Sequence, residues 1–123
     1  MKFMCLAYEE ESQLDVLSQS EWDALRRETI AYVDRLRAGG HLLTTYALQR
    51  AGTAATVRRR DGKRLVTDGP FAEAKEIVGG FFLIEARDRE EALALAADWP
   101  SARFGAIEVR PVEEALPEAT RYR

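Results

Sequence analysis

Residues 81–111, FFLIEARDREEALALAADWPSARFGAIEVRP, contain a complete strand–helix–strand pattern. The segment 81–86 is apolar at most of its alternating positions, which predicts a strand buried on both faces. A helix is predicted over 88–99, because an aspartate and a glutamate three residues apart have the spacing of a capping box and a proline follows the last turn. A final strand is predicted over 104–110.

The first part of the chain repeats this order of elements. Residues 2–8, KFMCLAY, are almost wholly apolar and predict another strand buried on both faces. A helix is predicted to begin at Ser20, with Asp23 as its capping-box partner, and to end at Ala38 before two glycines. Residues 41–48, HLLTTYAL, predict the strand that follows.

A β-hairpin is predicted between the two strand–helix–strand units. Residues 55–60 and 63–67 flank Asp61-Gly62, a dipeptide suited to a two-residue type I′ turn. Such a turn sets the register, which pairs Val57 with Val66.

Two such units joined by a hairpin predict an α+β fold, the ferredoxin-like sandwich, with both helices on one face of the sheet. Residues 1–116 form this single domain, and residues 117–123 are predicted to be a loose C-terminal tail. Two helices cover only one sheet face, yet the strands 2–8 and 81–86 are apolar on both. An uncovered apolar face of this kind is typical of an association site, so a homodimer is expected.

Composition excludes several classes of protein. Among the 123 residues, 18 Lys and Arg against 21 Asp and Glu give a net charge of −3, which argues against direct nucleic-acid binding. One Cys and one His cannot form an intramolecular disulfide, a multi-cysteine zinc site or a multi-histidine centre, so no metal or cofactor is expected. No run of 18 apolar residues and no signal peptide is present, and a cytoplasmic location is expected.

The segment 68–80, DGPFAEAKEIVGG, holds the candidate catalytic residues. Its carboxylates Asp68, Glu73 and Glu76 lie around a Gly-Pro corner, and loop carboxylates beside an apolar wall are plausible general acids or bases. The simpler alternative is that Asp68 caps the turn and that the other charged groups are solvated.

Five further side chains are candidate ligand contacts. Lys75 and Arg103 could hold an anionic group, and Phe71 could supply an apolar wall. Tyr8, at the end of the first strand, could line a cleft or simply pack. His41 is a lone histidine at a strand start, where a structural role is the more common one. A salt bridge is the simpler role for Arg103.

The hairpin tip is strongly basic. Residues 58–64, RRRDGKR, place like charges opposite each other, which is unfavourable unless an anion or an acidic surface lies between them. Full solvation and screening by salt is the alternative.

Three residues are expected in the core. Cys5 alternates with apolar neighbours and is predicted to be a buried thiol that does not act as a nucleophile. Trp22 and Trp99 lie on the inward faces of their predicted helices.

One block of sequence resembles a known family. The matching residues are VTDGPF at 66–71, AEAKE at 72–76 and GGF at 79–81, with further likeness at 56–61, 85–86 and 107–112. They resemble the DGPF branch of the YCII-related proteins. The resemblance implies a ferredoxin-like fold of the dimeric α+β barrel class, a bacterial origin, and relatives encoded beside or fused to extracytoplasmic-function sigma factors. The biochemical role of that branch is largely unassigned.

The chain departs from this pattern at two positions. Better-studied YCII-related proteins resemble enzymes with a His on the first helix near an Asp, and at least one eliminates chloride from a chlorinated aromatic. The matching helix position is about Thr29 here, and His41 does not replace it. Ala74 stands where the family usually has Thr.

Two functions follow from these observations. The first is a protein that binds a small molecule, anionic or not, in a pocket beside the DGPF loop, with or without lyase-like acid/base chemistry. The second is a non-catalytic regulatory or interaction protein associated with an extracytoplasmic-function sigma factor, which would use the run Glu9-Glu10-Glu11 or the basic hairpin.

Overall fold

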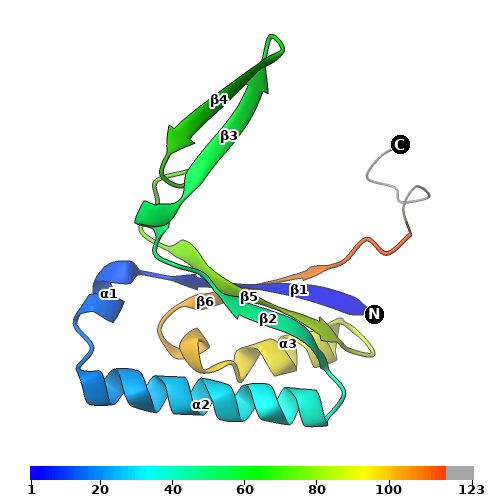
Figure 1. The fold of residues 1–123 in the computed structure, drawn as a ribbon. Helices are drawn as coiled ribbons and strands as arrows, with labels where there is room; N and C mark the ends of the chain where they lie inside the picture. The colour runs from blue at the N-terminus through cyan, green and yellow to red at the C-terminus, as the bar shows by residue number, and fades with distance from the viewer. Residues whose placement is uncertain (116–123) are drawn as a thin grey trace.

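The computed structural model describes residues 1–115, which form a four-stranded antiparallel sheet with its helices on one face and a separate hairpin on the other (Figure 1). The elements in chain order are β1 (Lys2–Glu9), α1 (Glu11–Asp15), α2 (Gln19–Ala38), β2 (Leu42–Ala47), η1 (Ala51–Thr53), β3 (Ala55–Arg60), β4 (Lys63–Asp68), β5 (Ile77–Glu85), α3 (Arg89–Ala97), η2 (Pro100–Arg103) and β6 (Ala106–Pro111).

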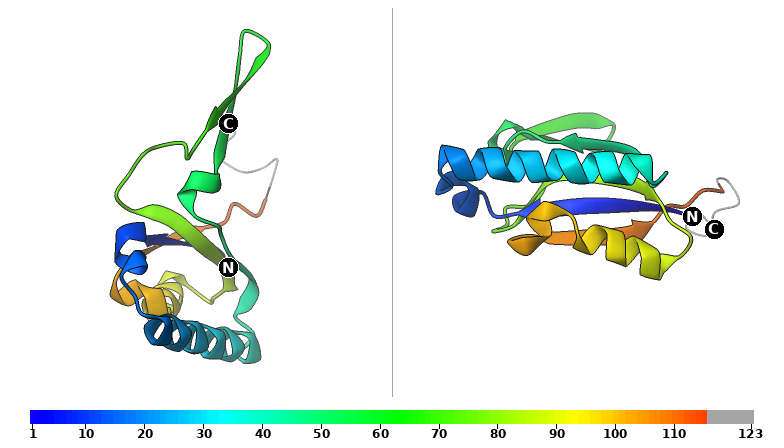
Figure 2. Two further views of the ribbon diagram at one scale, coloured as in Figure 1. Left: turned by 60° about the vertical axis from the view of Figure 1, so that its left-hand side comes forward. Right: turned by 90° about the horizontal axis from the view of Figure 1, so that it is seen from below.

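The sheet has the ferredoxin-like strand order. β1 and β5 are central, and the order across the sheet is β2-β5-β1-β6. Each pairing is antiparallel, so the two strand–helix–strand units interleave. Helices α2 and α3 lie side by side beneath the sheet (Figure 2). The α+β sandwich predicted from the sequence is therefore confirmed.

The core lies between the sheet and the helices. Phe3, Cys5, Phe82 and Ile84 are almost fully buried on the helix side of β1 and β5. The ring of Trp99 stacks on Phe82, with centroids 4.0 Å apart. The core prediction holds for Cys5 and Trp99, whereas Trp22 is only half-buried and does not belong to the core cluster.

Two helix boundaries differ from those predicted. α2 is capped by Ser18 with Glu21, not by Ser20 with Asp23. The hydroxyl of Ser18 accepts from the Glu21 N–H at 3.1 Å, and the Glu21 carboxylate accepts from the Ser18 N–H at 2.9 Å. Both serine–acid pairs have the spacing of a capping box. Ser18 and Glu21 are the pair in which each side chain accepts a hydrogen bond from the other residue's backbone N–H.

The ends of several other elements also shift. A short helix, α1, follows β1 and was not expected. α3 has the expected cap, Asp88, but ends at Ala97. β5 begins at Ile77, so the two glycines at 79 and 80 lie inside the strand and not before it. β6 begins later than expected, at Ala106.

The hairpin has the predicted register, with Val57 opposite Val66 and Arg59 opposite Arg64. Asp61 and Gly62 have φ of +51° and +72°, the left-handed pair that a type I′ turn requires. β3 and β4 project away from the sheet on the side without helices (Figures 1 and 2).

That side of the sheet is apolar and has no helix over it in the described part of the chain (Figure 1). Met4, Leu6, Phe81 and Leu83 are half-buried there. Tyr46, opposite Phe81 in β2, is 66% exposed.

The tail predicted for 117–123, and the domain boundary at 116, lie outside the described residues. Among the described helices, none is long and apolar enough to cross a membrane.

Candidate functional site

A cavity of about 380 Å³ lies between α2 and the sheet. Its floor is a row of the smallest side chains, because Gly80 pairs with Ala7 on one side and with Ala47 on the other. These three positions come from three neighbouring strands. Side chains this small cannot fill the space beneath the helix, so the sheet leaves room for a ligand.

One face of α2 forms the opposite wall. Trp22, Leu25, Thr29 and Val33 follow helical spacing and line the cavity. Ser101 in η2 and Trp99, the residue just before η2, close the cavity at one side. The wall is therefore mostly apolar and aromatic, which is typical of small-molecule sites.

A single carboxylate, that of Glu9, lies at this cavity. The register shift between Ala7 and Tyr8 leaves Gly79 without a partner in β1. The Glu9 carboxylate occupies the space that a Cβ at position 79 would need. Glycine at this position therefore makes room for the acid.

The electrostatics of Glu9 favour its neutral form. Desolvation by burial raises the pKa of Glu9, the charge of Glu11 raises it further, and Arg50 opposes both. A carboxyl group with a raised pKa is better suited to exchange a proton with a bound molecule.

Sequence reasoning missed Glu9 as a site residue because it lies within an acidic run. The signal that could have found it is the alternation along β1. Phe3, Cys5, Ala7 and Glu9 occupy successive positions of the face that the helices cover. A glutamate on the buried face of a strand is unusual in proteins, so Glu9 is a candidate functional residue.

A second cavity, of about 530 Å³, lies beside the DGPF loop. It brings together three of the predicted residues, Tyr8, Phe71 and Glu76, with Arg50 on the same lining. The Tyr8 hydroxyl donates to Glu108 at 3.1 Å, and this bond raises the pKa of Tyr8. Arg110 and Tyr8 both donate to Glu108, which lowers the pKa of that carboxyl.

The other loop residues that were predicted as site residues, Asp68, Glu73 and Lys75, line neither of these two cavities. Asp68 ends β4, pairs with Ala55 and is exposed. Glu73 is exposed. The exposed Lys75 side chain places its ammonium 3.8 Å from the half-buried Glu10 in an ion pair.

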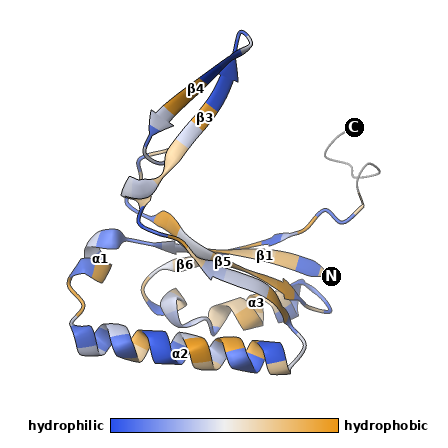
Figure 3. Ribbon diagram, viewed as in Figure 1, coloured by the Kyte–Doolittle hydropathy of each residue, from blue (hydrophilic) through white to orange (hydrophobic). Residues whose placement is uncertain are grey.

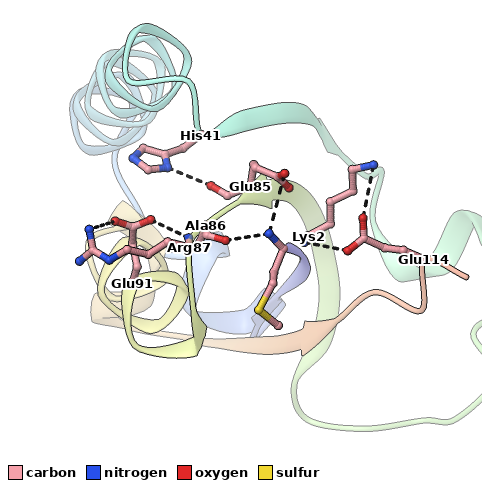
Figure 4. A network of polar contacts seen from close by, with 8 residues as sticks. Lys2, His41, Glu85, Ala86, Arg87, Glu91 and Glu114 are labelled. Atoms are coloured by element: carbon pink, nitrogen blue, oxygen red, sulfur yellow. Dashed lines mark hydrogen bonds and ion pairs between the residues drawn. The ribbon is translucent and has the colours of Figure 1, made fainter.

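Two predicted ligand contacts lie elsewhere. His41 is at the opposite end of the sheet, where its Nδ1 donates to the carbonyl O of Glu85 at 2.9 Å (Figure 4). The N-terminal amine donates to Ala86 O in the same region. Arg103 makes an ion pair with Glu28 at 2.6 Å, outside both cavities.

The two positions that depart from the family pattern do lie at cavities. Thr29 lines the cavity under α2, and its hydroxyl donates to Leu25 O at 2.8 Å. Ala74 lines the cavity beside the loop. Within residues 1–115, no group of three or more His, Cys, Asp or Glu side chains is placed to hold a metal ion.

Comparisons with known proteins agree with this fold. The family model of the YCII-related domain matches residues 1–115. An uncharacterised protein of Rhizobium meliloti (strain 1021) is 36% identical over 114 residues, covering 91% of this chain and 92% of that one. The structure of 5-chloro-2-hydroxyhydroquinone dehydrochlorinase (TftG) from Burkholderia phenoliruptrix AC1100, in complex with 2,5-dihydroxybenzoquinone, has a TM-score of 0.58. That match has 17% sequence identity and covers 94% of this chain and 96% of that chain, so the two share a fold. The sequence resemblance is confirmed: the chain belongs to the YCII-related family.

Proposed function

We propose that the chain binds a small aromatic molecule in the cavity under α2 and transfers a proton through Glu9. The observation that carries this function is the carboxylate of Glu9, held over Gly79 at the wall of a mostly apolar cavity. Burial there raises the pKa of Glu9, which suits a general acid or base.

The lining favours a flat aromatic ring. Trp22 and Trp99 supply aromatic surface, and Arg26 also lines the cavity, where it can attract an anionic substituent. A fold neighbour is a dehydrochlorinase that holds 2,5-dihydroxybenzoquinone, and this supports the same class of ligand. In an elimination, the carboxylate of Glu9 would accept the substrate proton while the electron pair left behind expels the leaving anion.

In this proposal Glu9 is favoured over the loop carboxylates as the general acid or base. Of Asp68, Glu73 and Glu76, Glu76 alone lines one of the two described cavities, and it is exposed. The cavity beside the loop is a second candidate site for the same ligand, with Phe71 and Tyr8 as its aromatic contacts.

The working unit in this proposal is a cytoplasmic homodimer joined through the open face of the sheet. Half-buried and exposed apolar side chains of β1, β2 and β5 cover that face. Contiguous apolar surface of this kind is stabilised by burial against a second copy.

Native mass spectrometry and calorimetric titration test these points. The first measures whether the purified protein is a dimer and whether it carries a ligand of a few hundred daltons. The second titrates 2,5-dihydroxybenzoquinone into wild-type protein and into Glu9→Gln. We expect the wild type to bind and Glu9→Gln to bind with a changed affinity and no proton exchange with buffer. Glu10→Gln, one residue away and ion-paired with Lys75, is the matched control and should behave as the wild type.

Absence of a co-purified ligand together with no heat of binding would contradict the small-molecule function. The alternative, a non-catalytic partner of an extracytoplasmic-function sigma factor, would then be the leading one. Capture of a stoichiometric sigma factor from the native host is the measurement that would support it.

A further inference from the structure

The β3–β4 hairpin has an apolar face that nothing in the described chain shelters. Val57 and Val66 lie opposite each other and are 63% and 54% exposed. On the other face, Thr56 donates to Gly69 O at 3.0 Å and the Arg58 guanidinium lies over the Phe71 ring, so the DGPF loop covers that side. The Val57–Val66 face is therefore the bare one.

On its Val57–Val66 face the hairpin lacks stabilising contacts within the described residues. Two isolated strands are only marginally stable in water. Arg59 opposite Arg64 and Arg60 opposite Lys63 add like-charge repulsion near the tip. The strands are hydrophilic at the tip of the hairpin, and apolar residues follow further from the tip (Figure 3). Both features would be compensated by a partner with an apolar region and an acidic region.

A second copy of this chain offers both. The hairpin, residues 55–68, has five basic and two acidic side chains and a formal charge of +3, which leaves −6 on the rest of a chain whose net charge is −3. The bare face of the hairpin is close in the chain to exposed apolar residues of the sheet, Tyr46 and Leu48. The charges of arm and body are thus complementary.

The length of the hairpin also fits a second copy. Strands of six residues extend about 20 Å, whereas sheets that pack face to face lie about 10 Å apart. The hairpin stands on the open side of the sheet (Figure 2). If a second copy packed on that face, the hairpin of the first copy would extend past the edge of the second copy's sheet. Its tip would then reach the helices of the second copy.

We infer that the β3–β4 hairpin is a dimer arm: its Val57–Val66 face packs on a second copy, and its basic tip meets acidic side chains of that copy. This arm rests on the homodimer proposed above. It adds a contact that sheet packing alone does not require.

Sedimentation velocity on the full chain tests the arm. The double variant Val57→Ser/Val66→Ser should weaken the dimer at least tenfold. Leu65→Ser, on the opposite face of the same hairpin, is the matched control and should leave dimerisation unchanged. Equal weakening by the control, or no weakening by the double variant, would overturn the arm while leaving the sheet-face dimer in place.

Cross-linking gives a second, independent readout. Lys63→Cys carries a photoreactive label at the tip, since the natural Cys5 is fully buried. In a mixture of ¹⁵N-labelled and unlabelled protein, we expect mixed-isotope cross-links from the tip to peptides of α2 or α3. Cross-links within one chain only, from a protein that sediments as a dimer, would overturn the arm. A monomeric wild type would overturn the dimer and the arm together.

Discussion

The carboxylate of Glu9 lies where the side chain of any residue other than glycine at position 79 would have to be. Glu9 ends β1, and Gly79 is the residue of β5 that the register shift leaves unpaired. The two positions are 70 residues apart in the chain, and they form one unit at the wall of the cavity. The site therefore depends on a missing Cβ as much as on an acid.

Gly79→Ala tests this relationship. The new methyl group would displace the Glu9 carboxylate, which is the flexible end of its side chain. We expect the free energy of unfolding to change by less than about 1 kcal/mol, and binding of 2,5-dihydroxybenzoquinone to change as in Glu9→Gln. The double variant should match the single ones, because each single change already takes the Glu9 carboxylate out of its place over Gly79. Gly52→Ala, which meets open space, is the control and should bind normally.

The pH dependence of stability should report the environment of Glu9. Its pKa is raised in the folded state, so the folded protein holds the extra proton between the unfolded and folded pKa values. Stability contributed by this group is present below that window and is lost as pH rises through it. Glu9→Gln should remove this loss, as measured by urea unfolding at a series of pH values. Parallel curves for wild type and variant would show that Glu9 is solvated.

Thr29→Val should leave ligand binding unchanged within about twofold. The Thr29 hydroxyl donates to Leu25 O within the helix, so the cavity receives mainly its methyl group, which valine keeps. Trp22→Ala is the contrasting variant, because it removes a large part of the wall and should weaken binding. A strong loss of affinity in Thr29→Val would instead assign the hydroxyl to the ligand.

Tyr32→Phe should destabilise the fold by about 1 kcal/mol. The Tyr32 hydroxyl donates to Leu95 O at 2.6 Å and so connects α2 to α3. Its ring also packs edge-on against Trp99, a contact that phenylalanine preserves. Thermal or urea unfolding measures the loss, with Tyr46→Phe on the open face as control. Equal stability of wild type and Tyr32→Phe would show that the hydroxyl adds nothing to helix packing.

Cys5 should not react with a thiol reagent in the native protein. Burial raises the pKa of the Cys5 thiol to about 12, and its side chain is fully buried. A colorimetric disulfide reagent should therefore label the protein only in urea. Labelling of the native state at the rate of a free thiol would mean that β1 opens readily.

Local patterns were sufficient for most of the secondary structure. The turn chemistry of Asp61-Gly62 determines the hairpin register, because a two-residue turn leaves one pairing. Competing caps were harder to separate. Ser18 and Ser20 each have an acidic residue three positions later. Which of them caps α2 depends on where the folded backbone enters the helix.

From the sequence alone, the order of strands and helices, the hairpin register and the family could be predicted, since these depend on neighbours in the chain. The pattern of β1 is apolar on both faces and did not say which face the helices cover. Only the tertiary structure decided where the site lies. The row Ala47–Gly80–Ala7 and the contact of Glu9 with Gly79 join residues from separate strands. The position of the cavity depends on the register between strands and on the space that the side chains of α2 do not fill. Both depend on residues from separate segments, so no single segment of the sequence predicts them.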